Sequence, residues 1–263
     1  MKKVNTHASW ESFVYIEQDK DIDIYIDRAI NTKRSGVTTI LLLQEPVRKW
    51  WKWARENQDK YDYLFTYFKD LLDIDKAVYF YCPTAFVRPY KKTFKRDEVS
   101  YVMSGRLNNK GHYLRYELHK RWNEITYPKR LFYSSRVTFK GEKHKDAEHL
   151  KYDGNFQKEP VLYSYYHIAI DTEDEFFNSE KLIDCFLMKS IPIYWGPKHY
   201  EGEFAKEGVL HAENVDEIIT ICNTLKDYDL YRELEEAMEF NYHKALRYTD
   251  FNEYLSEKIK HLI

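Results

Sequence analysis

Short apolar runs alternate with amphipathic polar stretches along most of the chain. These runs are four to eight residues long and rich in β-branched and aromatic side chains, so each predicts a β-strand. They lie at residues 23–26, 36–43, 63–67, 77–81, 99–103, 130–133, 166–170 and 191–195. The run at 36–43 ends in four consecutive apolar residues, Ile40 to Leu43, which predicts a buried strand.

The stretches between these runs predict helices at residues 48–57, 112–124 and 180–189, and the tail from residue 216 predicts more, the last at 250–263. The helix at 180–189 follows Ser179, a residue type that caps helix N-termini, and its apolar side chains fall on one face. With the strands at 166–170 and 191–195 on either side, it predicts a right-handed parallel βαβ unit.

The strand and helix alternation restarts after a basic, polar stretch at residues 90–97, which we interpret as a linker. This rhythm predicts an α/β protein with two Rossmann-like domains, at residues 1–95 and 96–263, facing across a cleft. In such sheets ligands bind at the carboxyl ends of the strands. Glu45, Ser104 and the segment 171–181 are therefore expected on the cleft side.

Composition narrows the class of protein. The hydrophobic fraction is 43% and the charged fraction is 32%, which excludes disorder for most of the chain. A formal net charge of −2 predicts no large basic field for nucleic acid. Cys82, Cys185 and Cys222 lack disulfide or zinc spacing and suit a reducing compartment. With no signal peptide and no apolar run long enough to span a bilayer, we expect a cytoplasmic protein.

The start of the helix after Ser179 is the first candidate for chemistry. Free backbone N–H groups and the positive end of the helix dipole make an anion site there. Lys181 opposes that dipole unless it shares the site with a phosphate, and Glu180 could bind a sugar hydroxyl. The alternative is a solvated pair of charges at a helix start.

Glu45 and Arg115 are two further candidates. Glu45 ends an apolar strand, where desolvation raises the pKa of a carboxyl group as a general base requires. The alternative is a carboxylate in contact with water. Arg115, in the helix after the loop 104–109, could bind two phosphate oxygens or could pair with Glu117 on the surface.

Several catalytic motifs are missing from the sequence. It has no G-x-S-x-G, no P-loop and no G-x-G-x-x-G, so the serine hydrolase, P-loop kinase and NAD-binding classes lose support. The histidines lack zinc spacing. The D-x-D pairs at 21–23 and 73–75 have the spacing that holds a divalent metal in some transferases, but one opens a strand and the other lies in a connection. We therefore predict no metal site.

One pair of segments resembles a known family. Residues 178–184, N-S-E-K-L-I-D, followed by residues 191–197, I-P-I-Y-W-G-P, resemble the donor-binding signature of the α1,3/1,4-fucosyltransferases, glycosyltransferase family 10. Weaker similarity extends to residues 43–46, to 63–67, and to 101–104 with Arg115. The sequence departs from the family at Ile170-Asp171-Thr172, where the family has F-E-N.

The resemblance implies a GT-B fold in which residues 96–263 bind GDP-fucose and residues 1–95 bind a glycan or glycolipid acceptor. It implies an inverting transfer of fucose with Glu45 as the base and no essential metal or other cofactor. The implied donor contacts are Ser104, Arg115, Asp171, Phe177, Glu180 and Lys181. A lipid-linked acceptor would place the protein at the periphery of a membrane.

Two other functions stay open. The altered segment 170–172 is compatible with a related transferase that uses another nucleotide sugar. A catalytically silent glycan-binding module is the second alternative, because tyrosine-rich surfaces bind sugars and protein partners.

Overall fold

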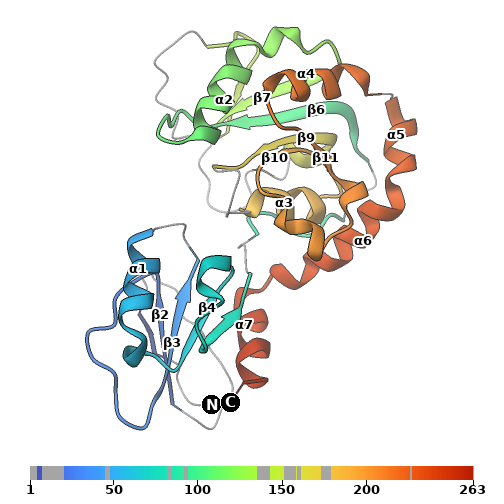
Figure 1. Ribbon diagram of the computed structural model, residues 1–263. Coiled ribbons are helices and arrows are strands. Elements are labelled where there is room, and N and C mark those ends of the chain that lie inside the picture. Colours follow the sequence, from blue (N-terminus) through green and yellow to red (C-terminus); the bar gives the residue numbers. More distant parts are fainter. Residues whose placement is uncertain are drawn as a thin grey trace. The chain divides into compact units, whose positions relative to one another are not determined.

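The computed structural model describes residues 5–7, 21–44, 48–81, 85–91, 94–134, 143–150, 158, 161–172, 179–225 and 227–262. The chain forms two compact units (Figure 1). Unit 1 comprises Met1–Pro83 and Asp250–Ile263, and unit 2 comprises Thr84–Thr249. None of the helices in the described ranges has both the length and the apolar character needed to cross a bilayer.

Unit 1 contains a five-stranded, fully parallel sheet in the order β1-β2-β3-β4-β5. The strands are β1 (Asn5–His7), β2 (Ile22–Ile26), β3 (Thr38–Leu43), β4 (Tyr63–Thr66) and β5 (Ala77–Tyr79). In β3, Ile40 to Leu43 are buried on both faces, as expected for a central parallel strand. The helices of this unit are α1 (Arg48–Glu56), α7 (Phe251–Lys260), and the 3₁₀ turns η1 (Gln58–Lys60) and η2 (Lys69–Leu71).

The last helix completes the core of unit 1. Tyr254 of α7 stacks on Phe80 with ring centroids 5.1 Å apart, and Leu255 and Ile259 are fully buried. The hydroxyl of Tyr63 donates a hydrogen bond to the carbonyl of Leu262. The C-terminal segment therefore returns to the unit in which the chain begins.

Unit 2 contains a six-stranded parallel sheet in the order β11-β10-β9-β6-β7-β8. Its strands are β6 (Arg96–Met103), β7 (Lys129–Tyr133), β8 (Glu148–His149), β9 (Ser164–Ile170), β10 (Ile191–Trp195) and β11 (Leu210–His211). The order runs outward from β6 through β7 to β8, and then resumes at β9 on the other side of β6. The strand order therefore reverses between β6 and β9, where open α/β sheets bind their ligands.

Helices cover both faces of this second sheet (Figure 1). They are α2 (Lys110–Lys120), α3 (Glu180–Leu187), α4 (Val215–Thr224), α5 (Asp227–Glu233) and α6 (Glu235–Ala245), with 3₁₀ turns η3 (Trp122–Glu124), η4 (Val161–Tyr163), η5 (Lys198–Gly202), η6 (Lys206–Gly208) and η7 (Leu246–Tyr248). Ile168 and Ile193 share one core with Leu118 of α2 and Ile218 of α4. Because strand side chains alternate, His167 and Asp171 belong to the opposite face, on the side of α3.

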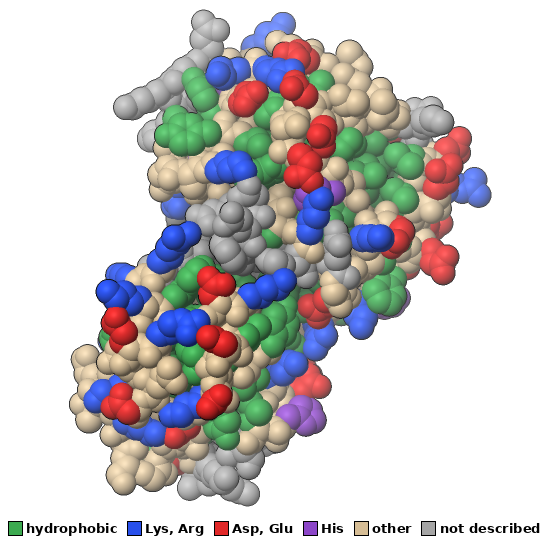
Figure 2. Space-filling view, viewed as in Figure 1, with side chains coloured by type: hydrophobic (Ala, Val, Ile, Leu, Met, Phe, Trp, Pro, Cys, Tyr) green, Lys and Arg blue, Asp and Glu red, His purple; other side chains and the backbone are tan. Residues whose placement is uncertain are grey.

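The observed strands and helices overlap all the predicted ones, and the parallel βαβ unit β9–α3–β10 is confirmed. The strands β1, β8 and β11 were not predicted because each is only two or three residues long and none of them contains an apolar run. Lys and Arg side chains are interspersed with Asp and Glu on the face that Figure 2 shows, so neither sign of charge dominates that face.

The division of the chain differs from the expected one at residue 95. Unit 2 begins at Thr84, and the last helix belongs to unit 1. The predicted linker is in part packed into unit 2, because the Lys95 ammonium donates to the carbonyls of Leu162 and Ser164 and to the Ser190 hydroxyl at 3.1–3.3 Å. Basic residues indicated a solvated connection, but this lysine finds neutral oxygen acceptors inside the unit.

Candidate functional site

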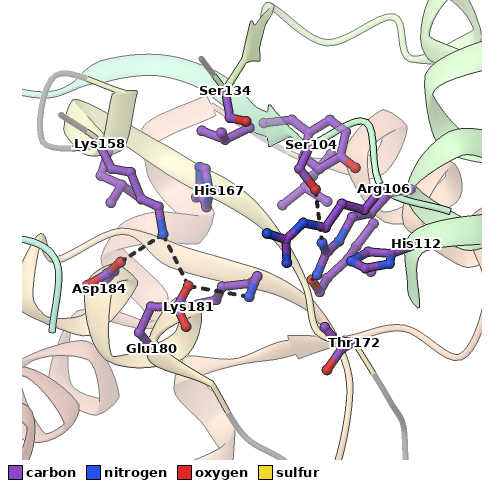
Figure 3. Close-up of a pocket in the computed structure, with 16 residues that line it drawn as sticks. Ser104, Arg106, His112, Ser134, Lys158, His167, Thr172, Glu180, Lys181 and Asp184 are labelled. Carbon is purple, nitrogen blue, oxygen red and sulfur yellow. Dashed lines mark hydrogen bonds and ion pairs between the residues drawn. The ribbon is translucent and has the colours of Figure 1, made fainter. Parts of the chain in front are cut away.

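A cavity of about 290 Å³ opens at the point where the strand order of unit 2 reverses. Ser104 follows β6, and Thr172 closely follows β9, so the cavity lies at the carboxyl ends of the two central strands. Figure 3 shows its polar side chains converging from these strand ends, from α2 and from α3. They are Ser104, Arg106, His112, Arg115, Ser134, Lys158, His167, Thr172, Glu180, Lys181 and Asp184.

Asp171 lies directly beside this cavity, and its hydrogen bonds hold the residues at the start of α3 in place. Its carboxylate is fully buried and accepts hydrogen bonds from the backbone N–H and the hydroxyl of Ser179. Tyr194 donates its hydroxyl proton to the same carboxylate at 2.6 Å, and the Lys181 ammonium lies 3.4 Å away. One buried carboxylate therefore links the end of β9 to the start of α3.

The start of α2 approaches the same point from the other side. The N–H of Gly111 donates to the carbonyl of Thr172 at 3.0 Å, and a Cβ at this glycine would lie 1.8 Å from the carbonyl oxygen of Asp171. A side chain at position 111 is therefore incompatible with the observed packing. Asn109 caps the helix by accepting from the N–H of His112, so α2 begins beside the cavity.

Lys181 is held where α3 begins. The Ser179 hydroxyl accepts from the backbone N–H of Lys181 at 3.3 Å and from its ammonium at 2.8 Å. The ammonium also lies 3.4 Å from the carboxylate of Glu180. The positive end of a helix and a lysine side chain thus occupy one wall of the cavity, an arrangement that attracts anions.

Arg115 is buried, and most of its hydrogen-bonding capacity is used within the protein. Its Nε and Nη2 atoms donate to the carbonyl of Ile170, the last residue of β9. Its Nη1 atom reaches the Ser104 hydroxyl at 3.5 Å, at the end of β6. The guanidinium therefore ties α2 to the ends of the two central strands, while Arg106 is an exposed cation at the cavity.

Lys158 forms an ion pair with two carboxylates of α3. Its ammonium lies 3.3 Å from Glu180 and 3.3 Å from Asp184. Although burial opposes ionisation of Glu180, Lys181 and Lys158 together hold its pKa well below the ordinary value. Burial raises the pKa of Asp184 to about 6, and the negative charge of Glu180 acts in the same direction.

The two histidines of the cavity are neutral at physiological pH. Burial, together with the positive charges of Arg115, Arg106 and Lys181, lowers the pKa of His112 to about 4. Burial likewise lowers the pKa of His167 to about 3. The Nδ1 atom of His167 lies 2.8 Å from the Ser100 hydroxyl, within the sheet. The positive charge of the cavity therefore comes from lysine and arginine.

Among the described lining residues, four carry fixed positive charges and two carry carboxylates: Arg106, Arg115, Lys158 and Lys181 against Glu180 and Asp184. Cations remain in excess when the adjacent buried Asp171 is counted. The surface of this cavity is therefore suited to an anionic ligand. No group of three or more His, Cys, Asp or Glu side chains within the described ranges is arranged to hold a metal ion.

The structure brings together four of the residues that the sequence singled out: Ser104, Arg115, Glu180 and Lys181 line the cavity. Asp171 lies beside it as their support rather than in its lining. Glu45 and Phe177 lie outside the described residues.

Sequence reasoning missed Arg106, Lys158, Asp184, His112 and His167 as lining residues. Arg106 could have been found, because it lies in the turn-rich loop that follows the strand ending at Met103. Asp184 falls one helical turn after Glu180 and therefore on the same face. No sequence signal marks Lys158, because it reaches the cavity from a polar region far from any motif.

The fold is that of GT-B glycosyltransferases. A glycosyltransferase from Rickettsia africae superposes with a TM-score of 0.63 and 14% identity, covering 92% of this chain and 76% of that one. An α1,3-fucosyltransferase crystallised with GDP gives a TM-score of 0.51 at 17% identity, covering 86% and 70% of the two chains.

A third similar structure is an S. aureus TarM mutant in complex with UDP and α-GlcNAc-glycerol. It gives a TM-score of 0.58 at 13% identity and covers 91% of this chain, which spans only 54% of that one. No protein-family model and no curated protein sequence matches the chain.

Proposed function

We propose that this protein is an inverting glycosyltransferase that moves fucose from GDP-fucose to a hydroxyl group of a glycan or glycolipid. One observation carries the proposal. One cavity, where the strand order reverses, is lined by four residues that sequence motifs up to 77 residues apart indicate: Ser104, Arg115, Glu180 and Lys181. The GT-B fold and the excess of cations in the cavity support the same function.

In this scheme unit 2 binds the donor. Lys181 and Arg106 contact the diphosphate, and the positive end of the α3 dipole adds to the attraction. Glu180 accepts a hydrogen bond from a hydroxyl of the donor sugar. When the bond between the anomeric carbon and the diphosphate breaks, the negative charge that grows on GDP is stabilised by cations that are already in place.

The acceptor reaction follows from the same scheme. A carboxylate removes the proton of the acceptor hydroxyl, and the oxygen attacks the anomeric carbon from the side opposite the diphosphate. The product is the fucosylated acceptor with inverted configuration, and GDP leaves. Glu45 is the proposed base on the strength of its sequence position after β3 alone. Phe177 remains a proposed donor contact on sequence grounds.

The direct test is release of GDP from GDP-fucose in the presence of GlcNAc-, Glc- and Gal-terminated acceptors. Lys181→Met should lower kcat/KM by about 100-fold, since a cation facing the leaving group is lost. Lys198→Met is the matched control, because Lys198 is an exposed lysine paired with Glu213. If the wild type binds no sugar nucleotide at millimolar concentration, the proposal fails.

The scheme assigns charge stabilisation to protein cations, so EDTA should leave GDP release unchanged. Activity that disappears with EDTA and returns with Mg²⁺ or Mn²⁺ would contradict this part of the proposal.

A related transferase that uses a uridine nucleotide is the second candidate. The TarM complex contains UDP, and Asp171 stands where the fucosyltransferase pattern has a glutamate. A ligand that binds only the folded protein raises its melting temperature. A larger shift with UDP than with GDP would favour this candidate.

A catalytically silent module is the third candidate. Replacing Glu45 by Gln should reduce turnover by about 100-fold or more in an enzyme and leave ligand affinity intact. A wild type that binds a nucleotide or glycan but releases no GDP would favour the silent module.

A further inference from the structure

Lys158 is a charged lining residue that neither the motif resemblance nor the donor scheme uses. Its ammonium bridges Glu180 and Asp184, at 3.3 Å from each. These carboxylates lie one turn apart on α3, and like charges at that spacing repel each other. Figure 3 shows Lys158 above the two carboxylates, reaching down from a separate part of the chain.

The positive charge of Lys158 matters because the carboxylates that it bridges are shielded from water. Asp184 is 2% exposed, and its Oδ1 atom accepts the backbone N–H of Phe86 at 2.7 Å. The ammonium of Lys158 also lies 5.2 Å from the centre of the Phe86 ring. Removing Lys158 would leave the buried carboxylate of Asp184 without its paired positive charge, which destabilises the charged form. Without Lys158, the two carboxylates would share one proton rather than both remain charged.

The bridge also restrains the orientation of Glu180. The ammonium groups of Lys158 and Lys181 both approach its Oε1 atom, at 3.3 and 3.4 Å. A carboxylate held between two cations from different parts of the chain has little rotational freedom. Since the donor scheme requires Glu180 to accept a hydrogen bond from a sugar hydroxyl, its charge and its orientation both matter.

We propose that Lys158 is a positioning residue for the donor sugar. By bridging Glu180 and Asp184, Lys158 keeps Glu180 charged and oriented in the cavity. This inference rests on the proposed function for the identity of the ligand. Lys158 acts through Glu180 and does not itself contact the reacting atoms.

The pH dependence of the bridge involves the charged and titratable groups that the described residues place around it. They are Lys158, Lys181, Asp171, His167, Cys185, Lys95, Arg106 and Arg115. Lys158 has a pKa above its usual value, because the two carboxylates outweigh the effect of burial. Within this set, replacing Lys158 removes a positive charge that contacts Glu180 and Asp184 directly.

The test compares Lys158→Met, Lys158→Arg and a control, Lys129→Met. Lys129 is a half-buried lysine whose ammonium donates to the carbonyls of Trp122 and Ile125, at the start of β7 and away from the strand ends that form the cavity. Measured readouts are titration of the Glu180 and Asp184 carboxyl carbons by NMR, taken to the lowest pH at which the protein stays folded, and kcat and KM for GDP-fucose over the same pH range up to 8.

Lys158→Met should raise the apparent pKa of the acidic limb of kcat/KM by about one unit or more, and the carboxyl titration should move in the same direction. Lys158→Arg should restore most of the wild-type profile, and Lys129→Met should leave the profile unchanged. A pH profile and carboxyl titration of folded Lys158→Met that superimpose on the wild type would overturn the proposal.

Asp184→Asn provides a second route if Lys158→Met does not fold. In the double variant Lys158→Met with Asp184→Asn, Glu180 no longer faces a like charge. The shift of the acidic limb should therefore be smaller than in Lys158→Met alone. If Lys158→Met is unfolded, we expect the double variant to recover folding. A double variant that is no better than the single one contradicts the bridge. If the wild type turns over no nucleotide sugar, the proposed function fails, and the carboxyl titration still decides whether Lys158 sets the charge of Glu180.

Discussion

At the scale of single residues, the charge of the cavity is set by burial and by close partners. His112 and His167 are neutral because both desolvation and the neighbouring cations oppose their protonation. Lys181 keeps its place because Ser179 and Asp171 accept from its ammonium. The sequence predicted that Glu180 and Lys181 are site residues, but it could not predict that Lys158, 22 positions before Glu180, pairs with the Glu180 carboxylate.

Asp171 gives the first prediction. Asp171→Asn replaces a carboxylate that accepts from Ser179 and Tyr194 with an amide whose NH₂ group faces those donors. We expect a loss of about 2–4 kcal/mol in the free energy of unfolding, together with at least about tenfold weaker GDP binding. Urea unfolding and GDP titration measure the two effects. Asp146→Asn, at an exposed position in the same unit, should change neither.

His119 gives a prediction about pH and stability. The Nε2 atom of His119 lies 2.8 Å from the hydroxyl oxygen of Tyr133, which also accepts the backbone N–H of His144. Burial, together with the nearby imidazole of His144, lowers the pKa of His119 from 6.5 to about 4. Between pH 6.5 and 4 the unfolded chain therefore binds a proton at His119 that the folded chain does not bind. The stabilisation by neutral His119 is complete above pH 6.5 and is lost as the pH falls toward 4.

The variant His119→Gln should flatten this dependence. Up to about 3 kcal/mol of the acid-induced loss of stability belongs to this residue, given about 1.4 kcal/mol for each pH unit between the two pKa values. The measurement is the free energy of unfolding in urea at pH 4.5, 5.5 and 7. The exposed His243 supplies the control, and His243→Gln should keep the wild-type slope. A His119→Gln slope equal to that of the wild type would show that His119 is not responsible.

At the scale of elements, local sequence patterns located the strands and helices well. Continuous apolar runs such as Ile40 to Leu43 specify buried strands whatever their neighbours are, and the cap at Ser179 is observed as expected. What the patterns could not specify is how closely elements approach. Gly111 had no visible meaning in the sequence, yet the absence of a side chain there allows α2 to meet the end of β9.

Replacing Gly111 by alanine tests this close approach. Alanine favours a helix by about 1 kcal/mol over glycine, so helix propensity alone predicts a more stable protein. We expect the opposite, a net loss of about 1–3 kcal/mol, because the new Cβ would lie 1.8 Å from the carbonyl oxygen of Asp171. Thermal unfolding and GDP titration should both report the change.

Gly202→Ala is the matched control for this substitution, since a Cβ at Gly202 would meet nothing within 4 Å. An unchanged or higher melting temperature for Gly111→Ala would mean that α2 can shift at no cost.

At the scale of the whole molecule, the sequence predicted an α/β chain with two parallel sheets but misplaced the connections. Composition suggested a boundary at the basic stretch 90–97, whereas the units divide between Pro83 and Thr84 and again between Thr249 and Asp250. A lysine such as Lys95 looks solvated in a sequence and is identified as packed only when its acceptors are known. Likewise, the amphipathic pattern of α7 does not indicate which of the two hydrophobic cores its apolar face packs against.

The assignment of α7 to unit 1 leads to the last prediction. Leu255 is fully buried, and its neighbour Tyr254 stacks on Phe80, so Leu255→Ala should lower the stability of unit 1 by about 2–5 kcal/mol. The binding residues proposed here for GDP lie in unit 2, so the melting-temperature shift with GDP should persist. Glu257→Ala, at an exposed position of the same helix, should leave unfolding unchanged. Differential scanning calorimetry with and without GDP distinguishes the two units, because only the transition of the nucleotide-binding unit should move with ligand. If Leu255→Ala instead lowers the transition that GDP raises, then α7 stabilises the donor-binding unit and its assignment to unit 1 is wrong.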